Sequence, residues 1–95
     1  MIRKGLNPMK IQLNDKQLYQ MILGNHLRLK RKERDLTQEE LAAEIEINAK
    51  HLGKIEQGSR EPRALLLGKI EYALDLDKKA IFEEYMEAIR KRDGD

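Results

Sequence analysis

The 95-residue sequence predicts an all-α protein with five helices. Residues that cap helix N-termini recur along the chain, at Asn14, Thr37, Asn48 and Asp77. After each of them, large apolar side chains recur at intervals of three and four residues, which places them on one face of a helix. These two observations predict the elements in the order given below.

The chain is predicted to begin with an N-terminal arm. Residues 1–13 contain a glycine, a proline and no helical periodicity, so we expect an extended or mobile segment. After the cap at Asn14, a first helix should run to about Arg34. Gly24 lies inside this helix and is expected to weaken it.

The next two helices are short and close together. Thr37 and Glu40 form a capping-box pair, which predicts a helix over about 38–45. The link that follows is too short for two parallel helices, and Asn48 is a second cap residue. A second helix is therefore predicted over about 49–57, at a steep angle to the first, and the glycine that follows should end it in the left-handed conformation.

This second helix has one narrow apolar stripe. Leu52 and Ile55 are its large apolar residues, and the opposite face is small and basic with no carboxylate. A short helix with an exposed N-terminal half fits the major groove of B-DNA. The same periodicity is equally typical of a plain helical hairpin in a small bundle, so it leaves both interpretations open.

Three motifs together resemble the Cro/repressor-type (XRE) helix-turn-helix family. They are the run Leu-Thr-Gln-Glu-Glu-Leu-Ala at 36–42, the Ile-Glu-x-Gly ending at 55–58, and Pro62. The resemblance covers about residues 23–76, and it is specific because each motif has its own structural role and the spacings agree. It implies a five-helix lambda-repressor-like fold that binds double-stranded DNA in a sequence-specific way.

The resemblance also implies roles for individual residues. Gln38 opens the first motif helix, where the family holds a DNA phosphate with the amide and the helix N-terminus. Arg31 and Glu56 stand at the positions of a structural ion pair. The base-reading positions fall on Ala49, Lys50 and Lys54, with His51 and Gly53 nearby.

Two residues depart from the family pattern. Glu46 stands where the family prefers a glycine with positive φ, which implies a strained or altered turn. Gly53 lies inside the recognition helix, where a glycine costs about 1 kcal/mol relative to alanine. It either allows close approach to the DNA or is simply tolerated.

Charge is unevenly distributed along the chain. Residues 1–36 sum to +6, residues 37–61 to −3 and residues 62–95 to −1, for a net charge of +2. The cations near the motif are expected to contact phosphates, although some of them are solvated residues that complement a helix dipole. The basic arm could also reach DNA, but a disordered leader is the favoured interpretation. The phosphate candidates besides Gln38 are Arg28, Lys30, Lys32 and Arg60.

Two more helices complete the chain. Pro62 suits the first turn of a helix over about 63–74. Leu67 is assigned to its inward side, which leaves Leu65 or Leu66 on a face that should be wet. The DNA-binding domain is therefore placed at residues 14–76.

The last segment, residues 77–95, is predicted to hold a helix from 78 to about 92 that is too apolar to lie free in water. It either folds back to complete the core or forms a homodimer interface. Helix-turn-helix proteins read two half-sites about 34 Å apart with a two-fold dimer, so dimerisation has a functional reason. We expect the helix to serve both roles in part. The residues expected at the dimer contact are mainly Leu66, together with Phe82, Tyr85, Met86 and Ile89, which should also contribute to the core.

Composition argues against several other classes of protein. There is no cysteine, and the chain offers neither a catalytic constellation nor a cofactor motif, so we expect no metal, no cofactor and no enzyme. No apolar run approaches the ~18 residues of a membrane span and no signal peptide stands out, which predicts a cytoplasmic protein. Only four aromatic residues argue against binding of single strands by stacking.

The sequence therefore predicts a dimeric transcriptional regulator, most simply a repressor that occludes a promoter by binding an inverted-repeat operator. A contact from the acidic first motif helix to RNA polymerase could make it an activator. The alternative is a protein-interaction module, such as an antitoxin that masks a partner protein, with DNA binding secondary. Lys50 and Lys54 discriminate between these, because an interaction module does not need a basic recognition face.

Overall fold

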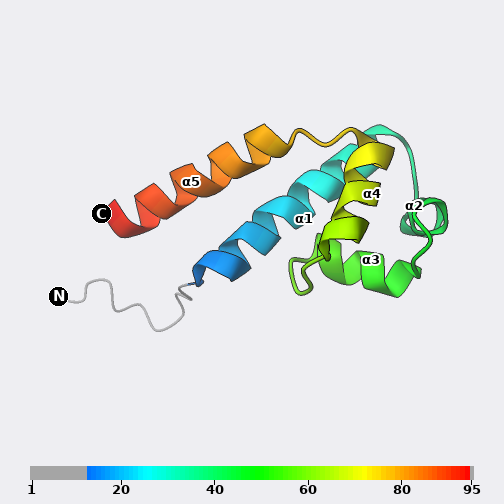
Figure 1. Ribbon diagram of the computed structural model, residues 1–95, viewed down its shortest axis with the longest axis horizontal. Helices are drawn as coiled ribbons and strands as arrows, with labels where there is room; N and C mark the ends of the chain where they lie inside the picture. Colours follow the sequence, from blue (N-terminus) through cyan, green and yellow to red (C-terminus); the bar gives the residue numbers. More distant parts are fainter. Residues whose placement is uncertain (1–12, 95) are drawn as a thin grey trace.

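The computed structural model describes residues 13–94 and shows five helices and no strand among them (Figure 1). This confirms the all-α, five-helix prediction. The predicted arm at 1–13 lies outside the described residues except for Leu13. The helices are α1 (Asp15–Glu33), α2 (Gln38–Glu44), α3 (Ala49–Glu56), α4 (Ala64–Leu74) and α5 (Lys78–Gly94).

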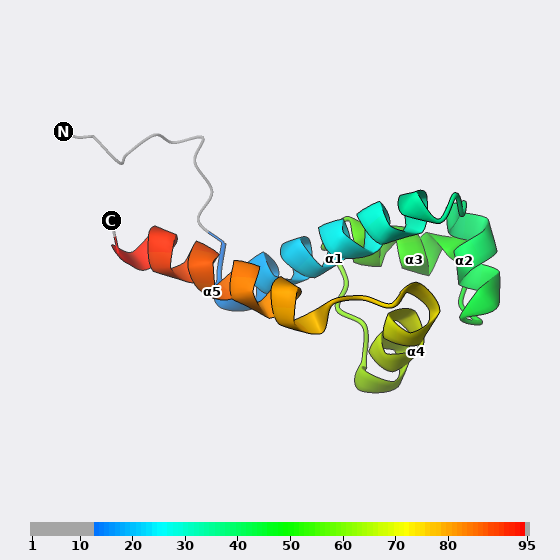
Figure 2. The same cartoon turned by 90° about the horizontal axis from the view of Figure 1, so that it is seen from above.

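The long helix α1 organises the molecule. It packs against α3, α4 and α5, while α2 packs against α3. Figures 1 and 2 both show α2, α3 and α4 grouped around the second half of α1, whereas α5 runs back beside its first half. The molecule therefore has a helix-turn-helix body at one end and a two-helix extension at the other.

Each end of the molecule has its own apolar core. The body is built around residues of α1 to α4 that are almost completely buried, and the extension around a smaller set from α1 and α5. Burying one such side chain contributes about 1.5 to 3 kcal/mol. The body core is Leu27, Leu41, Ala42, Ile45, Leu52, Ile55, Ile70 and Leu74, and the extension core is Ile22, Leu23 and Ile81.

Local side-chain caps begin the helices where the sequence places them. The side chain of Asn14 accepts a hydrogen bond from the N–H of Gln17, whose side chain accepts the Asn14 N–H in return. Thr37 and Glu40 form the same reciprocal pair at α2. Asp77 accepts the N–H of Ala80 at 3.0 Å. These bonds satisfy N–H groups that the first turn of a helix leaves without partners.

Gly24 is a close-packing position and not the weak point that the sequence suggested. It is buried where α1 crosses the end of α3, and a Cβ atom there would lie 2.4 Å from the carbonyl oxygen of Ile55 and 2.6 Å from that of Glu56. Only a residue without a side chain lets the two backbones approach so closely. The glycine therefore sets the separation of α1 and α3.

The fourth helix differs from its prediction at its N-terminus. It begins at Ala64, so Pro62 precedes it, and Arg63 is an N-cap residue that makes no side-chain cap bond. The leucine left in solvent is Leu65, which is 76% exposed. Leu66 is half-buried against the body core, and its assignment to the dimer contact stays a prediction.

Candidate nucleic-acid interface

The turn between α2 and α3 fixes the angle of the two motif helices. Glu46 adopts a left-handed conformation with φ of 64°, the geometry that the family glycine would take. The N–H of Ile47 donates to the carbonyl of Ala42 at 2.9 Å, which closes the turn. Gly58, with φ of 81°, ends the recognition helix as expected.

The recognition helix α3 presents one face to the core and another to solvent. Leu52 and Ile55 are fully buried, and the side chain of Asn48 caps the helix by accepting the N–H of His51 at 2.7 Å. The predicted base-reading residues differ in exposure: Lys50 is exposed, His51, Gly53 and Lys54 are half-buried, and Ala49 is half-buried against the body core. The structure therefore brings all five to the same short helix.

A buried ion pair joins α1 to the end of α3. Arg31 donates from Nε to Oε2 of Glu56 at 2.6 Å and from Nη2 to Oε1 at 3.0 Å, and both side chains are over nine-tenths buried. Arg31 also donates from Nη1 to the carbonyl of Leu36 at 2.7 Å. The hydrogen bond to Glu56 raises the pKa of Arg31 above its usual value, although burial acts in the opposite direction. Such a bidentate pair holds the recognition helix in one orientation.

Gln38 takes part in the same network, which the sequence did not indicate. Its Nε2 donates to Oε1 of Glu56 at 2.9 Å, so this carboxylate receives hydrogen bonds from two helices other than its own. Gln38 is half-buried. The bond joins residues 18 positions apart in the chain, so no local sequence pattern indicates it.

The predicted phosphate-contacting cations of α1 lie near its C-terminal end. Arg28 and Lys32 are exposed, and Lys30 is half-buried with its Nζ 3.6 Å from Glu33. Arg34, just beyond the helix, donates to the carbonyl of Ala73 at 2.9 Å and so helps to hold α4. Pairing of exposed charges at such distances contributes little to stability, so these cations stay available to other anions.

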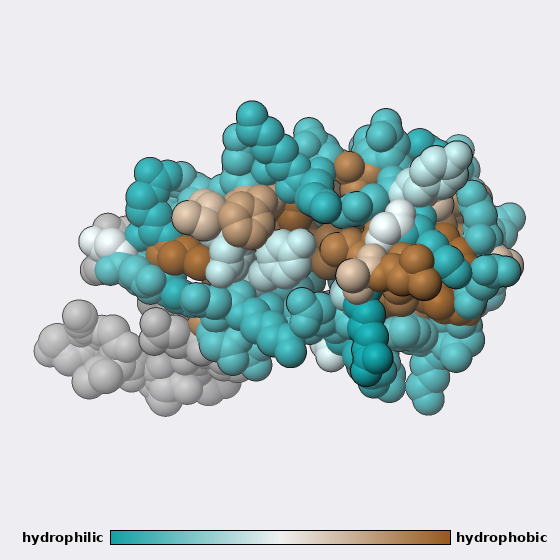
Figure 3. All heavy atoms as spheres, in the orientation of Figure 1, coloured by the Kyte–Doolittle hydropathy of each residue, from teal (hydrophilic) through white to brown (hydrophobic). Residues whose placement is uncertain are grey.

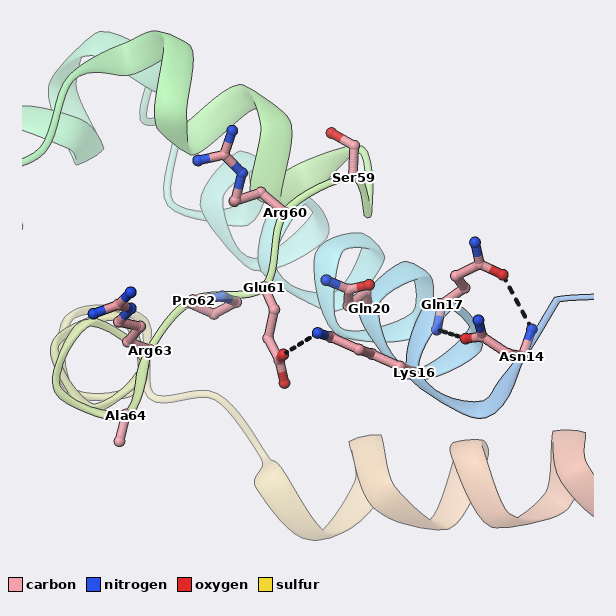
Figure 4. A pocket seen from close by; sticks show the side chains of 10 residues that line it. All are labelled: Asn14, Lys16, Gln17, Gln20, Ser59, Arg60, Glu61, Pro62, Arg63 and Ala64. Atoms are coloured by element: carbon pink, nitrogen blue, oxygen red, sulfur yellow. Dashed lines mark hydrogen bonds and ion pairs between the residues drawn. The ribbon is translucent and has the colours of Figure 1, made fainter.

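Arg60 borders a shallow depression of about 790 Å³ between the start of α1 and the α3–α4 connection (Figure 4). Lys16 and Glu61 face each other across it at 3.5 Å. Gln20 lines it and is almost completely buried. Arg63 lies on its rim at the uncapped N-terminus of α4. Arg63 was not among the predicted residues, although an arginine directly after a proline at a helix start could have indicated it.

An apolar surface extends along α5. Phe82 and Met86 are 51% and 52% exposed, and Tyr85 and Ile89 are half-buried. Tyr19 of α1 contacts the edge of the Tyr85 ring, with ring centres 5.6 Å apart. Figure 3 shows hydrophobic colour gathered along α5 and again on the side of α4. We call the surface formed by Phe82, Tyr85, Met86 and Ile89 the α5 face.

The described residues contain neither a metal-binding cluster nor a membrane-spanning helix. Between residues 13 and 94, no group of three or more histidine, cysteine, aspartate or glutamate side chains is placed to hold a metal ion. No helix in that range is long and apolar enough to cross a membrane.

Comparison with known proteins gives consistent matches. Residues 27–79, more than half of the chain, match a helix-turn-helix family model. A structure of the clp gene regulator ClgR from Corynebacterium glutamicum shares the fold with a TM-score of 0.65 and 24% identity, over 78% of this chain and 79% of that one. A second ClgR structure from C. glutamicum has a TM-score of 0.63 and 26% identity, over 73% and 88% of the two chains.

A third similar structure is a tyrosine-to-phenylalanine mutant of the restriction-modification controller protein C.Esp1396I. It aligns with a TM-score of 0.60 and 25% identity, over 79% of this chain and 95% of that one. No curated protein matches the sequence.

Proposed function

Because the chain belongs to the helix-turn-helix family of the Cro/repressor (XRE) type, we propose that it is a sequence-specific transcriptional regulator that binds an inverted-repeat operator as a homodimer. The fold is that of a DNA-binding domain, and the family is not enzymatic. The operator, the dimer and the direction of regulation are the parts that we propose.

The observation that carries the proposal is the outer face of α3. It is small and basic, it bears no carboxylate, and the Arg31–Glu56 pair holds the helix in one orientation. A short helix of this kind enters the major groove with its N-terminal residues against base edges. Lys50 and Lys54 supply hydrogen-bond donors there, and Ala49 begins the helix with a small side chain.

The DNA backbone is then contacted by residues around α3. Gln38 lies at the N-terminus of α2, where backbone N–H groups and the helix dipole favour a phosphate. Arg28, Lys30 and Lys32 are the cations of α1 that we assign to phosphates, and Arg60 follows the end of α3 in the chain. Phosphate contacts of this kind set the position of the protein but do not read sequence.

The α5 face supports a homodimer. Phe82 and Met86 leave about half of their surface in solvent, and the groove beside them, of about 620 Å³, has two lysine or arginine residues and two glutamates at its rim. In a dimer with a two-fold axis, the positive residues of one copy can therefore face the glutamates of the other. Leu66 is the further residue that we assign to the dimer contact, and the part of it that is not packed against the body core is available for this.

Regulation is the function of both kinds of similar protein. ClgR is described as a clp gene regulator and C.Esp1396I as a restriction-modification controller, and the matches with 25% and 26% identity span most of this chain. Repression by occlusion of a promoter needs only a dimer that binds its operator. It is therefore the simplest mode for a protein with these surfaces.

The test is selection of bound duplexes from a random DNA library, followed by titration of the enriched sites across a salt series. We expect an inverted repeat with half-site centres about one helical turn apart and a steep loss of affinity with salt. The Lys50→Ala, Lys54→Ala double variant should lose binding. The Lys78→Ala, Lys91→Ala variant removes the same charge from exposed positions of α5 and serves as the matched control.

The opposite result would direct attention to a protein partner. If no sequence is enriched, and the lysine variant of α3 binds duplexes like the parent, α3 does not read DNA. The alternative of an interaction module, such as an antitoxin, then rests on the exposed apolar residues of α4 and α5. Tyr72, which is 93% exposed, and Leu65 would be the first positions to test for contact with a partner.

A further inference from the structure

The side-chain amide of Gln38 is held on the recognition helix. Its Nε2 donates to Oε1 of Glu56 at 2.9 Å, and that oxygen also accepts from Nη2 of Arg31 at 3.0 Å. The Glu56 side chain is 2% exposed, so neither bond faces competition from bulk water. The amide is thereby tied to the end of α3, although Gln38 itself belongs to α2.

Gly53 provides the space in which this amide lies. Gly53 precedes Glu56 by three residues, so both are on the same side of α3. A Cβ atom at Gly53 would lie 3.6 Å from Oε1 and 3.7 Å from Nε2 of Gln38, which is ordinary contact. A methyl group therefore fits, whereas a longer side chain leaving Gly53 in that direction would occupy the place of the amide.

We propose that Glu56 and Gly53 are positioning residues for the phosphate contact of Gln38, an inference that rests on the proposed function. The Gln38 amide has two N–H bonds in one plane. Glu56 accepts one of them, and this fixes the direction of the other, which is the donor for a non-bridging phosphate oxygen. Hydrogen bonds to such a charged oxygen are stronger than those between neutral groups.

The arrangement has a physical advantage for binding. A free glutamine side chain has among the largest rotamer entropies, which it loses when it binds a phosphate. Here the carboxylate and the bare backbone of Gly53 have already ordered it, so less freedom remains to be lost. The phosphate contact is also tied to α3, so the backbone position and the base-reading face keep one fixed relation. This explains why no long side chain stands at this position of the recognition helix, without requiring that Gly53 contact DNA.

The first part of the test uses the protein without DNA. Side-chain ¹⁵N relaxation should show the Gln38 amide to be as ordered as the backbone, while Gln57, which is exposed, serves as the mobile control. In the Gly53→Leu variant, the Gln38 amide should become as mobile as that of Gln57. Equal mobility of Gln38 and Gln57 in the parent protein would overturn the proposal.

The second part uses the selected operator duplex with single methylphosphonate replacements, each of which removes the charge of one phosphate. The parent should lose affinity about tenfold at one backbone position, a loss typical of a charged hydrogen bond. The Gln38→Ala and Gly53→Leu variants should both be insensitive to replacement at that position. The Gly68→Leu variant is the matched control, because a Cβ at Gly68 meets nothing within 4 Å.

A double-mutant cycle separates positioning from obstruction. If Gly53 acts through Gln38, then Gly53→Leu should cost nothing further in the Gln38→Ala background. If the two losses add, the leucine side chain obstructs the DNA directly and the positioning role is refuted, while the proposed function stands. If the parent binds no duplex at all, the proposed function itself fails, which is a distinct result.

Discussion

Replacing Gly24 with alanine tests how closely α1 and α3 cross. In an open helix interior this substitution stabilises a protein by about 1 kcal/mol. At Gly24 the new Cβ would lie 2.4 Å from one backbone carbonyl oxygen and 2.6 Å from another, and both oxygens belong to the last turn of α3. Neither oxygen can rotate away as a side chain could. The two helices must therefore separate.

The expected magnitude follows from two opposing effects. Overpacking a tight contact costs about 1 to 3 kcal/mol or more, and a clash with two backbone atoms is at the upper end. After the helix-propensity gain is subtracted, Gly24→Ala should destabilise the protein by about 2 kcal/mol. For a domain of this size that corresponds to a melting temperature lower by about 10 °C.

The assay is urea unfolding followed by circular dichroism, at one fixed protein concentration because association would shift the midpoint. Gly68→Ala is the matched control, since it makes the same chemical change in a helix where the Cβ is unobstructed. It should gain about 1 kcal/mol. A Gly24→Ala variant as stable as the parent would refute the close crossing.

Three further predictions concern the ion pair, an alkaline transition and the α5 face. Glu56→Ala leaves Arg31 buried without its partner and should cost about 3 to 5 kcal/mol in urea unfolding, whereas a loss below 1 kcal/mol would show that the pair is dispensable. Burial, and to a smaller extent two nearby glutamates, raise the pKa of Tyr19 above 10.0. The stability that this residue contributes is therefore complete below pH 10 and is lost as the pH rises through the higher folded-state pKa. Unfolding free energies measured from pH 8 to 12 should fall less steeply in Tyr19→Phe, and identical slopes would contradict this assignment. Phe82→Glu or Met86→Glu should weaken self-association at least tenfold in sedimentation equilibrium, because both residues are half exposed in the single chain. The helix content should not change. A dimer that is unaffected by these substitutions would exclude the α5 face as its interface.

The sequence predicted best what depends on neighbouring residues. The caps at Asn14 and Thr37 and the left-handed Gly58 each use partners within a few positions, so the helix starts and the end of α3 could be located closely. The family motifs supplied the positions of Arg31 and Glu56, which the structure joins in an ion pair. The DNA contacts assigned to Lys50 and its neighbours remain predictions.

What could not be predicted depends on how the helices pack. The local sequence predicts Gly24 to be a weak point, whereas its role arises from carbonyl groups about thirty residues away. The bond between Gln38 and Glu56 likewise joins two helices. The run of three leucines in α4 gives no phase of its own, so only the packing of α4 decides that Leu65 is exposed and Leu66 is half-buried.

The small core under α5 also affects how the molecule opens. Among the described residues of this helix only Ile81 is fully buried. Near its far end, Arg92 donates to the Leu13 carbonyl at 3.0 Å and to Asp15 at 2.8 Å. Helices with so few buried contacts exchange their amide hydrogens through partial opening, while a core around residues such as Leu52 requires global unfolding. Deuterium should therefore enter α5 before α3. Any partner that covers the α5 face would slow that exchange, so the least protected helix is also the one whose protection reports assembly.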